Sequence, residues 1–291
     1  TTCDSYHIRF MAQNSMHEDG VEGYMYLEHW GLNDFPFENV PNPRYYFESS
    51  ALQTLCEDLS DAIVRRKGAI VLTGDIGCGK STVTQRILLN LPENRFDVAL
   101  ITYSMLSPTE MLYEVGQQLG LDLPQQQDKN SILKALQNHL TKNAETGRGT
   151  LICIDEAQSI PSIDTFEELR LLLNFQLGSS FLVSLLLVGQ PELQNKIAAL
   201  PQLKQRIALN LNLTHFDPET TMHYILHRLR AAGCIRPILT RQAIAAIHRH
   251  TEGVPRRINH LLDRCLLVGK RESNSLLDSR LVAMTIQRYP S

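Results

Sequence analysis

The chain has 291 residues, of which 43% are hydrophobic and 20% are charged. This composition is typical of a folded globular protein and excludes disordered and collagen-like chains. The 28 Lys and Arg side chains against 31 Asp and Glu give a formal net charge of -3, so the chain as a whole has no positive field that indicates indiscriminate binding to nucleic acid. At about 150 residues per domain, the length predicts about two domains.

The sequence has no feature that predicts a membrane span, a secretory leader or a disulfide framework. The apolar run at 181–188 is far shorter than the roughly 18 residues that cross a bilayer. The six cysteines are scattered without a CxxC pair, which argues against a zinc site or a set of disulfides. We therefore expect a cytoplasmic protein with no membrane span in this chain. Residues 1–24 are expected to form a non-secretory leader or a flexible arm outside the fold.

The middle of the chain alternates apolar runs with amphipathic stretches. The pattern predicts strands at 69–73, 97–103, 150–154 and 181–188, separated by helices at 81–91, 111–119, 131–143 and 165–177. Right-handed crossovers place such helices on both faces of a parallel sheet. The sequence therefore predicts an α/β fold with a three-layer core.

After about residue 216 the pattern indicates helices only. We expect them at 218–232, 240–251, 255–270 and 278–288. Two of these stretches have helix-start signals, Asp217 followed by proline and Thr240. The expected organisation is a leader at 1–24, an α/β core at 25–215 and a small all-helical unit at 216–291.

Gly74 to Ser81 matches the phosphate-binding pattern GxxxxGK[ST] and lies between an expected strand and an expected helix. Glycines allow backbone N–H groups to surround phosphate oxygens, and the helix presents its positive N-terminus to them. We expect Lys80 to reach the β and γ phosphates and Ser81 to coordinate Mg²⁺. The expected nucleotide-binding residues are Gly74, Asp75, Ile76, Gly77, Cys78, Gly79, Lys80, Ser81 and Thr82.

Cys78 lies inside this loop and has two interpretations. The favoured one is a small side chain at a variable position of the loop. In the other, the helix N-terminus lowers the pKa of the thiol, and oxidation of Cys78 switches the site off.

Two carboxylates follow the apolar run at 151–154. Downstream of a phosphate loop, one such carboxylate can hold the metal and the next can orient and deprotonate the attacking water. We expect Asp155 to bind Mg²⁺ and Glu156 to act as the base. Without the phosphate loop, a solvated turn or a helix cap would be the better interpretation.

Several further blocks, in fixed order, resemble an AAA+ ATPase. They are Met25–Leu32, Phe35–Phe37, Pro41–Tyr46, Ile154–Gln158, Phe166–Leu172, Leu187–Leu193 and Gly253–Asn259. More narrowly, they resemble the ExeA/GspA-type ATPases of type II secretion, which are related to the TnsC/TniB transposition regulators. The resemblance runs from Met25 to about Leu267 and implies a P-loop AAA+ core followed by a helical lid.

The resemblance also implies roles for residues whose own chemistry is ambiguous. Gln190 matches the sensor-1 position, where a polar side chain senses the γ-phosphate; by itself it is an ordinary polar turn residue. Arg256 matches the sensor-2 arginine of the lid and would couple the lid to the nucleotide. With Lys80 and Glu156, both are expected to support catalysis.

Members of this family commonly complete the site with an arginine from a neighbouring subunit. Arg206 is the candidate here, and a surface arginine is its alternative. Related sequences often carry a further arginine four positions on, where this chain has Asn210. Arg170 is a second choice, and an ion pair with Glu167 would explain it equally.

The opening block, Met25 to Tyr46, is rich in aromatic residues from Trp30 onward. We expect it to pack in the interior and to form a wall beside the adenine, because aromatic side chains bury large areas. Stacking against DNA bases is the weaker interpretation.

Three functions remain open. The first is an ExeA/GspA-like ATPase that binds and hydrolyses ATP with Mg²⁺ at the subunit interfaces of a homo-oligomeric ring or filament. It would use hydrolysis to drive or regulate assembly of a larger machine with a partner protein. The second is a TnsC/TniB-like regulator that forms filaments on DNA. The third is a slow nucleotide-dependent switch that acts by binding a partner protein. The second is supported by the basic residues of the lid, namely Arg228, Arg230, Arg236, Arg241, Arg249, Arg256, Arg257, Arg264, Lys270 and Arg271.

Overall fold

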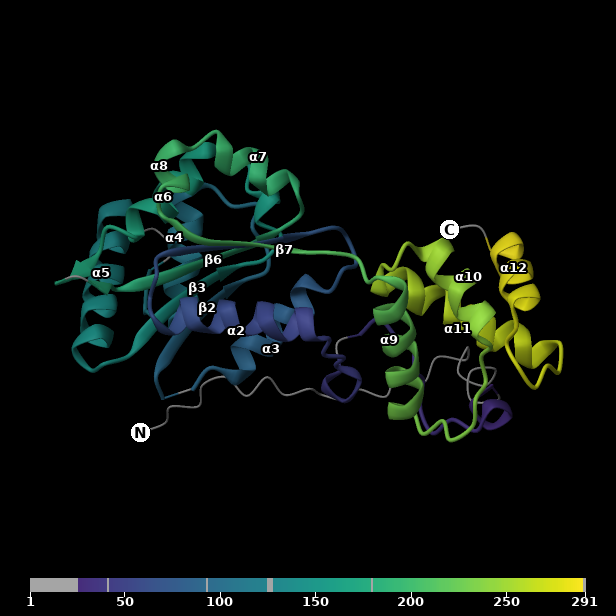
Figure 1. Ribbon diagram of the computed structural model, residues 1–291. Coiled ribbons are helices and arrows are strands. Elements are labelled where there is room, and N and C mark those ends of the chain that lie inside the picture. Colours follow the sequence, from purple (N-terminus) through teal and green to yellow (C-terminus); the bar gives the residue numbers. More distant parts are fainter. Residues whose placement is uncertain (1–25, 41, 93, 125–127, 179, 290–291) are drawn as a thin grey trace.

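The protein forms two units, a sheet with helices on both faces and a helical bundle beside it (Figure 1). The computed structural model describes residues 26–40, 42–92, 94–124, 128–178 and 180–289. The expected leader at 1–24 and the first residue of the opening block, Met25, lie outside the described residues. No helix of the described residues is both long enough and apolar enough to span a membrane.

Five parallel strands form the main sheet, in the spatial order β2-β3-β6-β1-β7. The strands are β1 (Ala69–Gly74), β2 (Phe96–Ile101), β3 (Gly149–Ile154), β6 (Val183–Gly189) and β7 (Ile207–Leu213). Parallel strands end at the same edge of a sheet, where ligands commonly bind. The loops that follow the neighbouring strands β3, β6 and β1 are therefore brought together.

Alternate strand residues face two separate hydrophobic clusters. One cluster contains Val71, Ile152 and Leu187, and is completed by α4 (Pro108–Gln118), α5 (Lys129–Glu145), α6 (Ile163–Leu172), α7 (Glu192–Ala198) and α8 (Pro201–Lys204). The other contains Leu72, Cys153 and Val188, and is completed by α2 (Ser50–Val64) and α3 (Lys80–Asn90). Strands covered on both faces read as continuous apolar runs, and the predicted three-layer core is confirmed.

Two predicted boundaries near residue 177 are wrong. The expected helix at 165–177 ends at Leu172, and the expected strand at 181–188 is divided. Gln176–Leu177 (β4) and Ser180–Phe181 (β5) form a short antiparallel hairpin, and β6 begins only at Val183. Gly178 has a φ of +60° in the turn, which glycine adopts without strain. The apolar residues of the hairpin continue both patterns, so periodicity does not reveal the break.

The helices of the second unit begin and end close to their predicted positions. They are α9 (Pro218–Ala231), α10 (Arg241–Thr251), α11 (Pro255–Arg271) and α12 (Ser279–Arg288). The Asp217 carboxylate accepts a hydrogen bond from the N–H of Thr220 at 2.6 Å, and the Thr240 hydroxyl accepts one from the N–H of Ala243 at 3.0 Å. Both predicted helix starts are thus capped by the side chain that indicated them.

The opening block packs on the helical unit rather than inside the α/β core. Trp30 is fully buried, and its Nε1 donates a hydrogen bond to the Leu266 carbonyl oxygen of α11 at 2.9 Å. Gly269 allows this approach, because a Cβ there would lie 2.7 Å from Cζ2 of Trp30. The segment at 26–47 therefore belongs to the same hydrophobic cluster as α9 to α12, whereas the sequence grouped it with the core.

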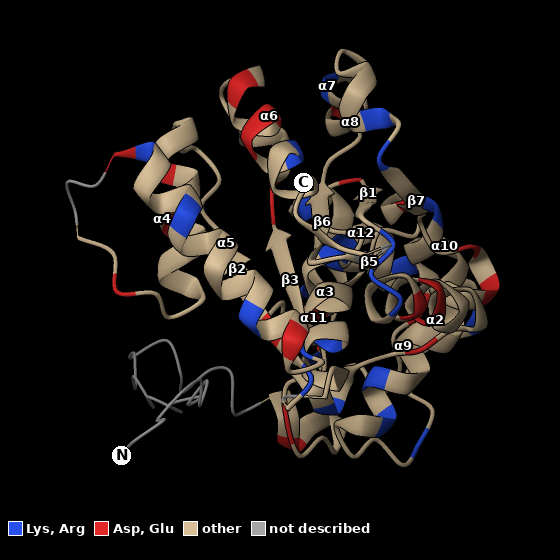
Figure 2. Cartoon of the chain, turned by 90° about the vertical axis from the view of Figure 1, so that its left-hand side faces the viewer, with Lys and Arg blue, Asp and Glu red and all other residues tan. Residues whose placement is uncertain are grey.

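Charge is divided unevenly between the two units. Residues 216–291 contain 12 Lys and Arg against six Asp and Glu, while the whole chain has a formal charge of -3. Basic segments are visible on α9 and the neighbouring helices (Figure 2). Arg228 is an exception, because it is only 6% exposed and lies inside the unit.

Candidate nucleotide site

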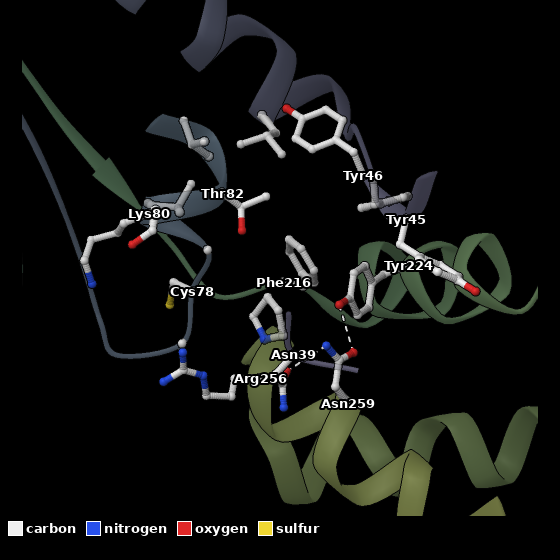
Figure 3. Close-up of a pocket in the computed structure, with 18 of the residues that line it drawn as sticks. Asn39, Tyr45, Tyr46, Cys78, Lys80, Thr82, Phe216, Tyr224, Arg256 and Asn259 are labelled. Carbon is white, nitrogen blue, oxygen red and sulfur yellow. Dashed lines mark hydrogen bonds between the residues drawn. The ribbon is translucent and has the colours of Figure 1, made fainter. Parts of the chain in front are cut away.

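A cavity of about 340 Å³ lies where the carboxyl edge of the sheet meets the helical unit (Figure 3). Its walls come from the opening block at 38–47, the phosphate loop with the start of α3, the strand ends at Glu156 and Gln190, and the helices α9 and α11. The cavity has the size that holds a small organic ligand.

The phosphate loop runs from the end of β1 at Gly74 to the start of α3 at Lys80. Gly77 and Gly79 have φ angles of +84° and +99°, which other L residues rarely adopt. A Cβ on Gly74 would lie 2.8 Å from the Leu213 carbonyl oxygen, whereas a Cβ on Gly79 would meet no atom of the described residues within 4 Å beyond its own neighbours. The loop thus leaves open space at the positive N-terminus of α3, where an anion binds favourably.

Lys80 is a buried cation in this loop, with 6% of its surface exposed. Its Nζ donates hydrogen bonds to the carbonyl oxygens of Gly74 at 2.8 Å and Asp75 at 3.1 Å. None of the ion pairs found among the described residues includes Lys80. A buried ammonium without a carboxylate partner is costly, and a phosphate in the cavity would supply the missing negative charge.

Ser81 and Asp155 meet although they lie far apart in the sequence. The Ser81 hydroxyl donates to Oδ2 of Asp155 at 2.9 Å, and Oδ1 of Asp155 accepts from the N–H of Glu156 at 2.9 Å. Hydroxyl and carboxylate oxygens are ligands that Mg²⁺ prefers, usually together with phosphate oxygens rather than in an all-protein cage. In agreement, the described residues contain no group of three or more His, Cys, Asp or Glu suited to a metal. The pair fits a Mg²⁺ ion that arrives with a nucleotide.

The Glu156 carboxylate is held by two glutamine side chains. Gln190 Nε2 donates to Oε2 of Glu156 at 3.2 Å, and Gln158 Nε2 donates to the same oxygen. Oε1 of Gln158 in turn accepts from the N–H of Gln190 at 3.0 Å. This network links the loops after β3 and β6 and places Glu156 and Gln190 in the cavity wall.

The lid contacts the phosphate loop directly at Gly77. The N–H of Arg256, in the first turn of α11, donates to the Gly77 carbonyl oxygen at 3.3 Å. A Cβ on Gly77 would lie 2.8 Å from Cβ of Arg256, so the two segments pack backbone to side chain. Arg256 thereby lines the cavity beside the loop (Figure 3).

A second contact joins the loop to the segment between the units. Nε2 of His215 lies 2.8 Å from Oδ2 of Asp75. Asp75 was expected only as a member of the loop, and the pattern of the sequence does not indicate its partner. Because His215 directly precedes Phe216 of the cavity wall, this pair ties the loop to the start of the lid.

Cys78 is buried, with 4% of its surface exposed. Burial raises the pKa of its thiol, Asp75 raises it further, and Lys80 opposes the shift. These shifts argue against the second interpretation, in which the pKa of the thiol is lowered, and agree with the favoured one. Since the thiolate is the reactive form, the structure favours a structural role for Cys78 over a redox switch.

Aromatic side chains surround the end of the cavity that is remote from Lys80 (Figure 3). The ring of Phe216 lies 5.2 Å from that of Tyr224, and 5.9 Å from that of Phe47, measured between centroids. Tyr45 and Tyr46 of the opening block complete this wall. The aromatic residues of the block thus pack in the interior and also face the cavity.

A family model described as an AAA domain matches residues 64–197. A curated relative, general secretion pathway protein A of Aeromonas hydrophila, is 32% identical over 248 residues, which is 84% of this chain and 45% of the relative. The chain is an ExeA/GspA-like AAA+ P-loop protein. It spans less than half the length of that relative.

Solved structures share the fold of this AAA+ chain at low sequence identity. The ORC2 protein of Aeropyrum pernix has a TM-score of 0.66 and 18% identity, covering 89% of this chain and 72% of its own. Cdc6p from Pyrobaculum aerophilum has a TM-score of 0.62 and 16% identity, with 87% and 70% covered. The RuvB branch migration motor of Thermotoga maritima has a TM-score of 0.56 and 17% identity, with 88% and 73% covered. The predicted P-loop AAA+ core with a helical region after it is confirmed.

The two arginines considered for a neighbouring site lie away from the cavity of this AAA+ chain. Arg206 precedes β7 at the amino edge of the sheet, donates to Oδ1 of Asn174 at 3.0 Å and lies over the Phe181 ring. Nε of Arg170 donates to Glu167 at 2.7 Å. Neither arginine reaches the phosphate loop of its own subunit, and a role in a neighbouring one stays a prediction.

Sequence reasoning missed several residues that shape the site. Gln158 follows Glu156 by two positions, and its place in the Asp-Glu-Ala-Gln run was the available signal. Asn39, Tyr224 and Asn259 also line the cavity. They come from three distant segments, so no local pattern groups them.

Proposed function

We propose that this chain binds ATP with Mg²⁺ in the cavity between its two units and hydrolyses it to ADP and phosphate. The observation that carries the proposal is one cavity lined by the phosphate loop, by Ser81 with its hydrogen-bond partner Asp155 behind it, and by Glu156. The AAA domain and the similarity to general secretion pathway protein A support it.

The side chains have complementary tasks in this proposal. Lys80 and the N-terminus of α3 stabilise charge on the phosphates, and Ser81 and Asp155 hold Mg²⁺, which neutralises part of that charge. Glu156 accepts a proton from the attacking water, and Gln190 positions that water, because it already binds Glu156. Arg256 reports the nucleotide state to the lid through its contact with Gly77.

The output that fits best is assembly of a larger machine by a homo-oligomer, with a partner protein of the secretion type. The similarity to general secretion pathway protein A carries this choice. In such an oligomer Arg206 of one subunit would complete the site of the next. A transposition-like role on DNA is the second candidate, because the lid has 12 basic against six acidic residues.

Replacing Glu156 with Gln tests the catalytic assignment. We expect Glu156→Gln to bind ATP as tightly as the wild type and to release phosphate about 100-fold more slowly, since a general base contributes at least this factor. The control is Glu145→Gln, at the exposed end of α5. Turnover of Glu156→Gln close to that of the control would remove Glu156 from the role of base.

Turnover and particle size with and without duplex DNA separate the two outputs. ATP-dependent oligomers whose turnover is indifferent to DNA support the secretion-like role. DNA-stimulated turnover together with ATP-dependent filaments supports the transposition-like role instead.

A further inference from the structure

A chain of four polar side chains crosses the aromatic end of the cavity. Nη1 of Arg228 donates to the Tyr224 hydroxyl at 2.9 Å, and this hydroxyl donates to Oδ1 of Asn259 at 2.8 Å. Nδ2 of Asn259 then donates to Oδ1 of Asn39 at 3.0 Å. Figure 3 shows Tyr224, Asn259 and Asn39 together on the side of the cavity opposite Lys80.

The direction of these hydrogen bonds is set by Arg228. A guanidinium only donates, so the Tyr224 oxygen accepts from it and passes its single hydrogen to Asn259. Asn259 must then present its oxygen to Tyr224 and its amide nitrogen to Asn39. Asn259 and Arg228 are only 3% and 6% exposed, and Nη2 of Arg228 is anchored on the Glu38 carbonyl oxygen at 2.9 Å. The Arg228 end of the relay and Asn259 are therefore held in place.

The amide of Asn39, at the cavity end of the relay, retains unused hydrogen-bonding capacity. Its Nδ2 retains two hydrogens, and its Oδ1 retains one lone pair after accepting from Asn259. Asn39 is exposed and lines the cavity, so a ligand can reach this amide. A side-chain amide with a donor and an acceptor matches adenine, whose 6-amino group donates beside a ring nitrogen that accepts.

The geometry points to Asn39 as the residue that reads the 6-amino group of adenine, with Arg228, Tyr224 and Asn259 as positioning residues that fix its orientation. This inference rests on the proposed function, because it takes the cavity to bind a purine nucleoside triphosphate. Oδ1 accepts the N6–H, and Nδ2 donates to the adjacent ring nitrogen. A 6-oxopurine places an acceptor opposite Oδ1, and its binding is penalised because the amide cannot turn round without breaking the relay.

Competition binding with three nucleotides tests the assignment: ATP, the triphosphate of purine riboside, which lacks the 6-amino group, and inosine triphosphate, which has a 6-oxo group. We expect the wild type to bind ATP about tenfold more tightly than either analogue. Asn39→Ala should bind ATP about tenfold more weakly and bind the three nucleotides nearly equally. The matched control is Asn138→Ala on the exposed face of α5, which should behave as the wild type.

Tyr224→Phe tests the relay separately, because it keeps the ring and removes the hydroxyl that orients Asn259. We expect this variant to lose most of the preference for ATP over inosine triphosphate while still binding both, a ratio that a general loss of stability would not change. A wild-type preference that survives in Asn39→Ala, or a wild type that binds the three nucleotides equally, overturns the inference and leaves ATP binding intact. A wild type that binds none of the three overturns the proposed function itself.

Discussion

The carboxylate of Glu156 is held in one position by its surroundings. Its backbone is left-handed, with a φ of +50°, which is uncommon for a residue with a side chain and is often found at functional sites. The Ser104 hydroxyl donates to its carbonyl oxygen at 2.8 Å, and Gln158 and Gln190 hold its side chain. Backbone and carboxylate are thus fixed from three different loops.

Asp263 of the lid is a half-buried carboxylate outside the cavity. Oδ1 accepts a hydrogen bond from the Tyr26 hydroxyl at 2.9 Å. Burial raises the pKa of Asp263, and the Tyr26 hydrogen bond and the nearby His260 and Arg264 only partly oppose this shift. The folded state thus binds the proton more tightly than the unfolded state, so the contribution of Asp263 to stability is largest at low pH and is lost as the pH rises from about 3.8 through the raised folded pKa.

Asp263→Asn should therefore stabilise the protein near neutral pH. The amide oxygen still accepts from Tyr26, and the cost of a buried charge disappears. We expect a melting temperature at pH 7 about 2 °C above that of the wild type, with a smaller gain at pH 4. The control is Asp58→Asn on the exposed face of α2. A variant that melts below the wild type at pH 7 would contradict this role of burial.

Local motifs identified the phosphate-binding half of the site. Residues 74–82 and the pair at 155–156 are contiguous, so the sequence displays them directly. The other half is assembled from Asn39, Tyr224 and Asn259, which the fold brings together from distant positions. Single-sequence patterns do not encode such long-range contacts, and for this reason the individual residues at the aromatic end of the cavity could not be predicted.

At the scale of elements, the phosphate loop packs tightly against the start of α11. Gly77 combines a φ of +84° with a Cβ position only 2.8 Å from Cβ of Arg256 and 3.3 Å from Cγ1 of Val254. An alanine there would strain the loop and also push the lid away. The contact thus couples the shape of the loop to the position of the lid.

Gly77→Ala measures this coupling when it is compared with Gly147→Ala. Gly147 has a φ of +78°, but a Cβ there meets no described atom within 4 Å beyond its neighbours, so its substitution costs only about 1 kcal/mol of backbone strain. We expect Gly77→Ala to unfold with a free energy at least about 1 kcal/mol lower than Gly147→Ala and to bind ATP more weakly, whereas Gly147→Ala keeps its affinity. Denaturant unfolding and ATP titration measure both quantities. Equal effects of the two substitutions would exclude a coupling between the phosphate loop and the lid through Gly77.

The helices of the lid were predicted within about two residues because polar caps and apolar periodicity coincide there. The hairpin β4–β5 and helix α2 were not predicted. In the hairpin, Phe175 and Leu177 extend the apolar pattern of α6 past its true end. In α2, the apolar residues lie between many small and polar ones, and only packing against Ile70 and Leu72 of the sheet explains their burial.

At the scale of the whole molecule, the opening block joins the two units around the cavity. Trp30 anchors the block on α11, while Tyr45 and Tyr46 line the end of the cavity that is remote from Lys80. Residues far apart in the sequence thus close the site from the side opposite the sheet. A change in lid position would move α9, α11 and the opening block together, which suits a protein whose output depends on the nucleotide it holds.

Isothermal titration of Mg²⁺–ATP into the wild type and Lys80→Ala tests most directly whether this cavity binds the nucleotide. Lys80 is the buried cation of the loop, and loss of a charge-assisted hydrogen bond costs about 1.5–3 kcal/mol. We expect the wild type to bind one ATP per chain and Lys80→Ala to bind at least about tenfold more weakly, with the exposed Lys134→Ala on α5 as the control. Equal affinity of the wild type and Lys80→Ala, or a wild type that binds no ATP, would contradict the assignment of this cavity.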